Sequence, residues 1–377
     1  MSDVAELGAQ LVAIESINPE LGVGGSGETE IARYVAEWCE RAGLETALSD
    51  AAPGRPNVVA IARGSGSGRS LMLNAHMDTV GVAGMADPFE ARLDGERLYG
   101  RGSYDMKGSL AASMLATAEA ARRGLRGDVI LTAVADEEFA SIGTEAIAAS
   151  VRADAAIVTE PTELQLVIAH RGYVHLEIET EGRAAHGGRP DLGVDAIAKM
   201  GRVLVAIEEL DLRLRGDPTH ALLGSGSVHA SLVEGGQEYS SYPARCVLQA
   251  ERRTIPGESV ESVVGEIQAI VAEAAMVDPD FSGTVRSLAS REPLGVEEDA
   301  EVVTALRRCA TSALGSEPDV VGAAWWAESA LLAAAGIPTV VFGPRGGGAH
   351  SEVEWVDVAS LEQCVEIYVR VATEICA

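Results

Sequence analysis

Basic residues and cysteine are both scarce in this chain of 377 residues. Lys and Arg total 29 against 57 Asp and Glu, which gives a net charge of −28. A field of that sign repels phosphate, so the composition argues against nucleic acid and anionic membranes as partners. The five cysteines are odd in number and contain no Cys-x-x-Cys pair. They predict reduced thiols, and neither a disulfide framework nor a zinc knuckle.

Long apolar runs and short repeats are also missing, and no signal sequence is expected. The apolar run 330–335 ends at Gly336, far short of the roughly 18 residues that a membrane span needs. The N-terminal residues lack the positively charged region of a signal peptide. With 47% apolar residues, the chain is long enough to bury a large core and to form two domains. We therefore expect a globular, cytoplasmic protein.

Hydrophobic periodicity in the first half of the chain alternates between strand and helix. A long Ala-rich segment over about 107–123 predicts a helix, and short apolar runs predict strands at 57–62, 71–75, 129–135 and 155–158. Nearly continuous apolar strands that alternate with helices are typical of a mostly parallel α/β sheet with helices on both faces. The Gly-Ser segment 64–68 between the first two strands is short enough for a hairpin turn.

The middle of the chain has a different pattern. Residues 173–180 alternate strictly between apolar and polar, as a half-exposed antiparallel strand does. Further strands near 227–233 and 246–252, with helices near 194–210 and 258–274, predict two helices on one face of a four-stranded sheet. The α/β pattern returns after about Ser290. We therefore predict a split α/β domain, residues 1–171 and 289–377, with an inserted α+β domain, residues 172–288.

Acidic and imidazole side chains follow the predicted strands. The set comprises His76 and Asp78 after 71–75, Asp105 in a Gly-rich segment, Asp136-Glu137-Glu138 after 129–135, Glu160 after 155–158, and His350 in a Gly-rich loop. In an open α/β sheet the functional crevice lies outside the carboxyl ends of the strands. Mixed nitrogen and oxygen ligands there suit zinc, with manganese or cobalt as substitutes. Taken singly, each residue has a plainer interpretation. Asp105, for example, could cap the following helix.

These residues, in this order, resemble the M20 metallopeptidase and deacylase family, which includes acetylornithine deacetylases, succinyl-diaminopimelate desuccinylases, aminoacylases and glutamate carboxypeptidases. The matching motifs are Ala75-His-Met-Asp-Thr-Val80, the segment 100–108, Asp136-Glu-Glu138, Glu160-Pro161 and Gly348-Ala-His350. The resemblance implies two Zn²⁺ ions per subunit, for which Co²⁺ or Mn²⁺ could substitute. It implies His76 and Glu160 as ligands of one ion, Glu138 and His350 as ligands of the other, and Asp105 as the bridge.

The resemblance also implies that Glu137 is the catalytic base and that Asp78 supports the ring of His76. His76 and Asp78 are two residues apart on an extended segment, so their side chains share a side, and the carboxylate can accept the non-ligating N–H. Glu137 and Glu138 are adjacent and point apart. One can therefore bind metal while the other accepts a proton from water. A purely structural carboxylate is the alternative for Glu137.

Two residues of the middle domain complete the predicted site. His186 resembles the family's lid histidine, which reaches the partner subunit's active site and would stabilise an oxyanion there. Arg253 resembles the position that supplies an arginine for the substrate carboxylate. A packed loop residue and a surface ion pair, respectively, are the alternatives. The resemblance thus implies a catalytic domain in 1–171 and 289–377, and a homodimer formed through a lid or dimerisation domain, 172–288.

We therefore predict a dinuclear-metal amidohydrolase that cleaves the amide bond of an N-acyl amino acid by attack of metal-activated water. The alternative is an M20-type exopeptidase, a carboxypeptidase or dipeptidase that cleaves a short peptide with the same site. A non-catalytic small-molecule binder is a third hypothesis, against which the intact Glu137 and ligand set argue. The sequence departs from the family pattern at Ser240, where Asn is usual, and at Ala327-Glu328-Ser329, where Thr-Asp-Ala is usual. Both regions face substrate in relatives, so no particular metabolite is assigned.

Overall fold

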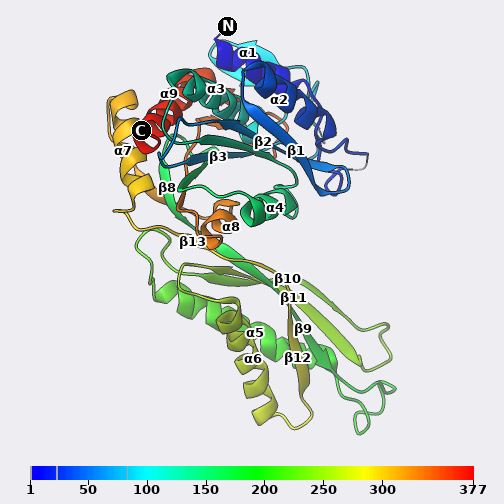
Figure 1. Cartoon of the computed structure of the whole chain (residues 1–377). Coiled ribbons are helices and arrows are strands. Elements are labelled where there is room, and N and C mark those ends of the chain that lie inside the picture. Colours follow the sequence, from blue (N-terminus) through cyan, green and yellow to red (C-terminus); the bar gives the residue numbers. More distant parts are fainter. Residues whose placement is uncertain (1, 23, 83) are drawn as a thin grey trace. The chain divides into compact units, whose positions relative to one another are not determined.

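The structure is a computed structural model that describes residues 2–22, 24–82 and 84–377, and it divides the chain into two compact units. The first unit comprises Met1–Ile168, Val296–Val321 and Ala327–Ala377, and the second comprises Ala169–Gly295 and Gly322–Trp326. The second unit is thus mainly an insertion in the sequence of the first (Figure 1). Among the described helices, none has the length and apolarity that crossing a membrane requires.

The first unit is built around a sheet whose central strands are parallel. The strand order is β1-β2-β6-β3-β7-β15-β8. Neighbouring pairs from β6 to β15 are parallel, whereas β1, β2 and β8 run antiparallel to their neighbours. The strands are β1 (Glu45–Ala52), β2 (Arg55–Ala62), β3 (Leu71–His76), β6 (Val129–Val134), β7 (Ala155–Val158), β8 (Leu166–His170) and β15 (Thr339–Val341). Every residue of β3, β6 and β7 is buried, which explains their continuous apolar sequences.

Helices cover both faces of this sheet (Figure 1). They are α1 (Asp3–Val12), α2 (Thr29–Arg41), α3 (Gly108–Arg123), α4 (Ile142–Ser150), α7 (Glu301–Leu314), α8 (Ser329–Ala334) and α9 (Val358–Ile375). On one face α3 packs against α1 and α9, and on the other α4 packs against α8. The many alanines of α3 are buried in these contacts, because small side chains let neighbouring elements approach closely. This architecture confirms the predicted α/β fold class.

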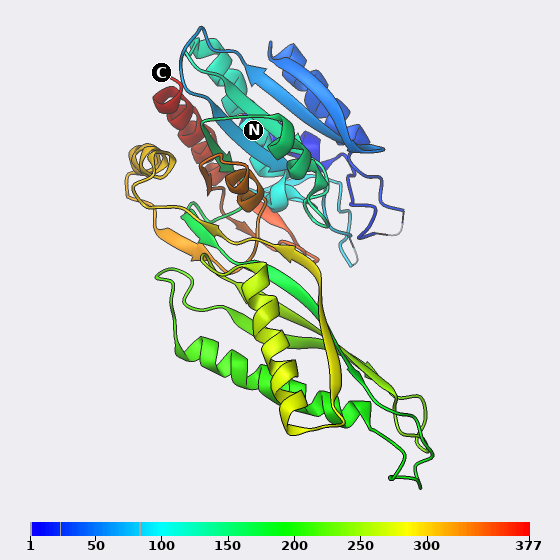
Figure 2. The ribbon, with the colours of Figure 1, turned by 60° about the horizontal axis from the view of Figure 1, so that its bottom comes forward.

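The second unit is a four-stranded antiparallel sheet with two helices on one face (Figure 2). In sheet order its strands are β10 (Ser227–Gly235), β11 (Arg245–Thr254), β9 (Gly172–Glu181) and β12 (Ser282–Arg291), and its helices are α5 (Ala196–Gly216) and α6 (Val260–Val277). The alternation along β9 places Val174, Leu176 and Ile178 in the core beneath the helices. Strand β13 (Leu294–Gly295) pairs with the end of β8, at Ala169 and His170.

The segment 64–68 is not the hairpin turn that the sequence predicts. It joins β2 to β3, but β6 lies between these two strands, antiparallel to β2 and parallel to β3. The backbone N–H groups of Ser65 and Gly66 donate to the carbonyls of Leu125 and Arg126 instead, over 2.9 and 3.0 Å. The prediction is wrong because the intervening strand begins only at Val129, beyond any local pattern.

A small sheet of short strands in the first unit holds the two loops that carry the predicted ligands Asp105 and His350. Its order is β16 (Gly346–Gly347), β17 (Trp355–Asp357), β5 (Arg97–Tyr99) and β4 (Arg92–Asp94). The loop that carries His350 joins β16 to β17, and the segment that carries Asp105 follows β5 directly. Because β17 pairs with β5, with Trp355 opposite Tyr99, the end of the His350 loop lies beside the start of the Asp105 segment although the two are far apart in sequence.

Candidate active site

The first unit brings together the five residues that the sequence marks as metal ligands. His76 is the last residue of β3, Glu160 follows β7, and Glu138 follows β6. These strands are parallel neighbours, so their carboxyl ends meet at one edge of the sheet. Asp105 and His350 reach the same place from the loops that the small sheet holds.

Asp105 lies between two His–Glu pairs. Its Oδ1 is 3.1 Å from Nε2 of His76, and its Oδ2 is 3.3 Å from Nε2 of His350. Nε2 of His76 is also 3.7 Å from Oε1 of Glu160. On the other side, Nε2 of His350 is 3.0 Å from Oε2 of Glu138. The two oxygens of one carboxylate therefore face two separate donor pairs, an arrangement that suits a carboxylate bridging two cations.

Two carboxylate oxygens of this cluster accept no hydrogen bond from any described residue. Within the described part of the chain, Oε1 of Glu138 and Oε1 of Glu160 are buried without a hydrogen-bond partner, which is costly for a buried acceptor. Donor atoms of His76, Glu137 and Glu160 lie within 4.8 Å of one another, as do those of His76, Asp105 and Glu138. Imidazole and carboxylate donors suit Zn²⁺, Co²⁺ or Mn²⁺. The residues present thus fit divalent cations.

Carboxyl groups outnumber imidazole rings in the cluster, and this shifts the pKa values of both kinds of group. Burial alone would lower the pKa of His76, but Glu160 and Asp105 outweigh it and raise the pKa well above its ordinary value. Hydrogen bonds with Asp105 and Glu138 raise the pKa of His350 to about 10. Burial raises the pKa values of Glu138 and Glu160. The metal-free cluster therefore holds protons that a bound cation would displace.

Glu137 and Asp78 lie beside the predicted ligands. Burial, followed by the charge of Glu160, raises the pKa of Glu137 well above its ordinary value. Nδ1 of His76 is 2.9 Å from the main-chain oxygen of Asp78 but 3.6 Å from its carboxylate. The main-chain oxygen can only accept, so in a neutral His76 ring the proton sits on Nδ1 and leaves Nε2 available as a ligand atom.

Two buried glutamates that the metal-ligand pattern does not include also contribute to the site. Glu354 accepts hydrogen bonds from Arg101 and from the backbone N–H groups of Gly102, Tyr104 and Asp105. It thereby holds the loop that presents Asp105. No periodicity or motif marks this residue, because its partners lie about 250 positions earlier in the chain.

Glu328, which the sequence marks only as a departure from the family pattern, is also buried. Its exposed fraction is 1%, and Nδ2 of Asn74 lies 3.3 Å from its Oε2. Burial raises the pKa of Glu328 to about 8, so the carboxyl group is mostly protonated at neutral pH. Asn74 is two residues before His76 in β3, so their side chains share a side of the strand, and Glu328 therefore packs on the same side as His76.

His186 and Arg253 both belong to the second unit. His186 is exposed, and its Nδ1 accepts the backbone N–H of Gly188 over 3.0 Å. In the neutral ring this places the proton on Nε2, where it can be donated. Arg253 donates to Glu251 and lies 5.6 Å from the ring centroid of Tyr173. The ion pair that is the alternative interpretation of Arg253 is thus present.

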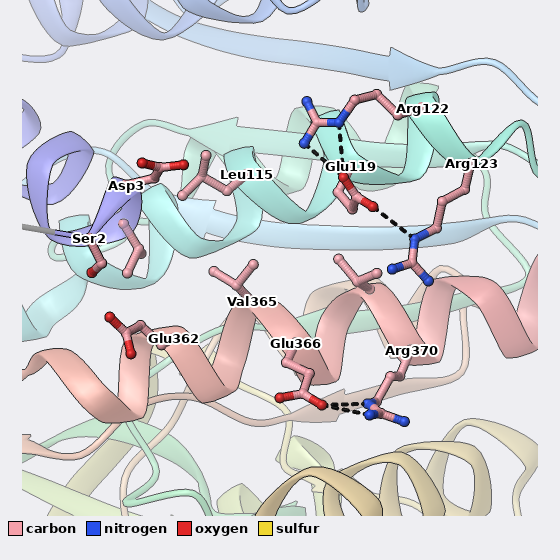
Figure 3. Close-up of a pocket in the computed structure, with 12 residues that line it drawn as sticks. Ser2, Asp3, Leu115, Glu119, Arg122, Arg123, Glu362, Val365, Glu366 and Arg370 are labelled. Atoms are coloured by element: carbon pink, nitrogen blue, oxygen red, sulfur yellow. Dashed lines mark hydrogen bonds and ion pairs between the residues drawn. The ribbon is translucent and has the colours of Figure 1, made fainter.

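A groove elsewhere in the first unit is unrelated to these residues. It has a volume of about 810 Å³ and is lined mainly by α3 and α9, with the start of α1 at one end (Figure 3). Its arginines are paired, Arg122 and Arg123 with Glu119 and Arg370 with Glu366. None of the predicted site residues lines it. We therefore place the candidate active site at the cluster around Asp105.

The fold and this cluster define a hydrolase of amide or peptide C–N bonds. The model of peptidase family M20/M25/M40 matches residues 72–374, and the chain belongs to that family. It is 33% identical to an acetylornithine deacetylase from Myxococcus xanthus, over 87% of this chain and 86% of that protein. It is also 29% identical to an N-formyl-4-amino-5-aminomethyl-2-methylpyrimidine deformylase from Halalkalibacterium halodurans, over 91% and 88% of the two chains.

Solved structures show the same fold at lower sequence identity. Aminopeptidase PepT from Bacillus cereus aligns with a TM-score of 0.83 at 18% identity, over 100% of this chain and 98% of that one. The M20 family metallo-carboxypeptidase Sso-CP2 from Sulfolobus solfataricus aligns with a TM-score of 0.78 at 20% identity, over 99% of each chain. The family resemblance that the sequence motifs predict is therefore confirmed.

Metal uptake is expected to release protons. The pKa of His350 is about 10, so at pH 7 the ring carries a proton that must leave before its nitrogen can bind a cation. Apparent Zn²⁺ affinity should therefore strengthen as pH rises from 6 towards 10. Calorimetric titration in buffers of different ionisation enthalpy counts the protons. The His350→Ala variant should release fewer protons than the wild type. The control variant His229→Ala, altered at an exposed position, should release as many protons as the wild type. Uptake without proton release would contradict the assignment.

Proposed function

We propose that this chain hydrolyses the amide bond of an N-acyl amino acid and releases a carboxylic acid and the free amino acid. The observation that carries the proposal is the position of Asp105, whose two oxygens face two separate His–Glu pairs. The deacetylase and deformylase names of two relatives favour a small acyl group on nitrogen. An exopeptidase that acts on a peptide bond with the same residues is the second candidate, because peptidases share the fold.

Two Zn²⁺ ions per subunit, replaceable by Co²⁺ or Mn²⁺, are part of the proposal. His76 and Glu160 would hold one ion, Glu138 and His350 the other, and Asp105 both. The unpartnered oxygens of Glu138 and Glu160 support this assignment. When bound, the ions supply Lewis acidity to the scissile carbonyl and lower the pKa of the attacking water.

Glu137 has the properties of the proton carrier. Its raised pKa makes its carboxylate a stronger base than an exposed glutamate. We propose that it accepts a proton from the attacking water and gives that proton to the leaving nitrogen. Meanwhile the water oxygen bonds to the acyl carbon and the C–N bond breaks. Asp78 supports this role, because its carboxylate holds the N–H groups of Glu137 and Glu138.

His186 and Arg253 are proposed to act on the substrate. His186 can donate from Nε2 to the developing oxyanion, because its Nδ1 is already occupied by the N–H of Gly188. We propose that it does so in the partner subunit of a homodimer formed through residues 172–288, with the catalytic domain in 1–171 and 289–377. Arg253 would bind the substrate carboxylate with its guanidinium fork. This requires Arg253 to exchange Glu251 for the ligand.

A cytoplasmic location completes the proposal. All five cysteines are free and buried, as is usual for a protein of a reducing compartment. The net charge of −28 supports small-molecule substrates over nucleic acid or anionic membranes.

A substrate panel tests the proposed reaction. The chain, loaded with Zn²⁺ or Co²⁺, is assayed against N-acetyl, N-formyl and N-succinyl amino acids and against dipeptides, with chelator-treated protein as the control. We expect hydrolysis of an N-acyl amino acid that chelation abolishes, because the reaction depends on the metal. Turnover of dipeptides alone would establish the exopeptidase in its place. Full activity after metal removal, with elemental analysis showing no metal, would overturn both.

Alanine variants of the adjacent Glu137 and Glu138 should distinguish the general base from the metal ligand. Glu137→Ala should lower kcat by about 10²–10⁴-fold and keep its metal, because it removes a general base. Glu138→Ala should instead lose metal, because it removes a ligand. Elemental analysis of both variants, purified in parallel with the wild type, makes the comparison. Since Glu137 also lies within 4.8 Å of donor atoms of His76 and Glu160, equal metal loss in both variants would show that Glu137 is a ligand too.

Mixed dimers test whether His186 acts across subunits. We expect Glu137→Ala and His186→Ala to be inactive alone. In a mixed dimer the first chain lends its His186 to the partner, whose Glu137 is intact, so one of the two sites is whole. Random pairing makes about half of the dimers mixed, so co-refolding should restore roughly a quarter of wild-type activity. No recovery, with mixed dimers confirmed by mass spectrometry, would reject the cross-subunit role.

A further inference from the structure

The backbone that carries Glu137 and Glu138 is held by buried carboxylates. The N–H of Asp136 donates to Oε1 of Glu28 over 3.2 Å. The next two N–H groups, of Glu137 and Glu138, donate to the two oxygens of Asp78 over 3.0 and 3.2 Å. Three consecutive N–H groups thus point at two side-chain anions. These hydrogen bonds fix the orientation of the peptide groups at Glu137 and Glu138, and so the direction in which both side chains leave the backbone.

Asp136 bears the strain of this turn. Its φ is +69°, a left-handed conformation that residues other than glycine adopt at a cost. Its side chain is held on two sides, because Oδ1 accepts from Nη2 of Arg55 over 2.8 Å and from Nδ2 of Asn18 over 2.9 Å. The side chain of Asp136 is 2% exposed. The surrounding contacts therefore keep the residue in a conformation that it would otherwise leave.

Arg55 connects the two anions on the Asp136 side. Its Nε and Nη2 form a fork on Glu28, over 2.7 and 2.6 Å, and Nη2 also reaches Asp136. The side chains of Arg55 and Glu28 are 13% and 0% exposed. One guanidinium thus lies between two buried carboxylates that would otherwise repel each other. Removal of one member of such a buried group leaves charge without a partner.

Asn18 carries the arrangement on to Asp78. Its Nδ2 donates to Oδ2 of Asp78 over 2.8 Å as well as to Asp136. Its Oδ1 accepts the N–H of Glu20 over 3.1 Å, so the orientation of the amide is defined. A continuous set of hydrogen bonds therefore runs from Arg55 through Asp136 and Asn18 to Asp78. At one end Glu28, which Arg55 binds, accepts the N–H of Asp136, and at the other end Asp78 accepts the next two N–H groups of the turn.

We propose that Arg55 is a positioning residue for Glu137 and Glu138. It holds Glu28 and Asp136 in place, and these fix the turn that aims the proposed base and the proposed ligand. The inference rests on the proposed function in that it takes Glu137 to be the base. Arg55 itself bonds to Glu28 and Asp136, which are not among the proposed metal ligands. Its loss should therefore disturb the geometry of the site without removing any group that reacts.

Arg63 is a matched control at the other end of the same strand. Its Nε and Nη2 form the same fork on Glu45, over 2.7 and 2.9 Å, and its Nη1 reaches Asp128 over 2.7 Å. Arg63 is 54% exposed, however, and its partners hold no part of the cluster. Both arginines thus bind one Glu and one Asp, Arg55 from the first residue of β2 and Arg63 from the position after its last residue. They differ in burial and in what their partners hold.

The experiment compares Arg55→Ala with Arg63→Ala and the wild type. For Arg55→Ala we expect Zn²⁺ affinity, measured by chelator competition, to weaken by about 10–100-fold. With metal at saturation, kcat should fall by about 10–100-fold while KM stays within threefold, because substrate contacts are intact. The Co²⁺ absorption spectrum should change, because the ligand Glu138 shifts. Millimolar guanidinium should restore part of the lost kcat. Arg63→Ala should match the wild type in all four readouts.

Arg55→Lys keeps the test decisive if the alanine variant does not fold. Lysine retains the buried charge but cannot form the fork, so it should fold and show an intermediate fall in kcat with a changed Co²⁺ spectrum. A folded Arg55 variant with wild-type kcat, metal affinity and spectrum would overturn the proposal. If the wild type hydrolyses nothing in the panel yet Arg55→Ala still differs from Arg63→Ala in metal affinity and spectrum, only the proposed activity fails.

Discussion

Uncompensated negative charge at the carboxyl edge of a buried sheet is the constraint on which this site depends. Asp105, Glu137, Glu138 and Glu160 are buried or half-buried around the buried His76, and His350 closes the cluster from the exposed side. Such a group of carboxylates is stable only with protons or cations between them. The raised pKa values of the cluster describe the first solution. Binding of divalent ions in exchange for those protons would be the second, and it suits hydrolytic chemistry.

Two irregular loops at this edge are held in the same way, by buried carboxylates that accept backbone N–H groups and are paired with an arginine. Glu354 accepts three N–H groups of the loop around Asp105 and is paired with Arg101, which is 2% exposed. Glu28 and Asp78 accept the N–H groups of the turn at residues 136–138, and Arg55 is the associated cation. A loop without ladder hydrogen bonds must satisfy its N–H groups elsewhere. Buried carboxylates do this and at the same time fix the direction of the functional side chains.

The extent to which the sequence predicts this molecule follows from how local each signal is. Strands β3, β6 and β7 are evident from their apolar runs, and the acidic or imidazole residues at their ends follow from the general rule for parallel sheets. The position of Asp105 needed the family resemblance, because it depends on strands of two or three residues. The hairpin expected at 64–68 is wrong because β6 inserts between the joined strands. The contacts of Arg55 span 27 and 81 positions, a separation that no periodicity records.

Glu328, which the sequence marks as unlike the expected family motif, is subject to the same constraint. Its side chain does not extend into solvent, since it is 1% exposed and meets Asn74 on the same side of β3 as His76. Burial raises its pKa to about 8, so at neutral pH this carboxyl group meets the constraint by keeping its proton. It therefore adds little charge to the cluster. A fixed negative charge at the same place would increase the need of the neighbouring carboxylates for protons or cations, whereas a neutral acid leaves that balance to the groups around Asp105.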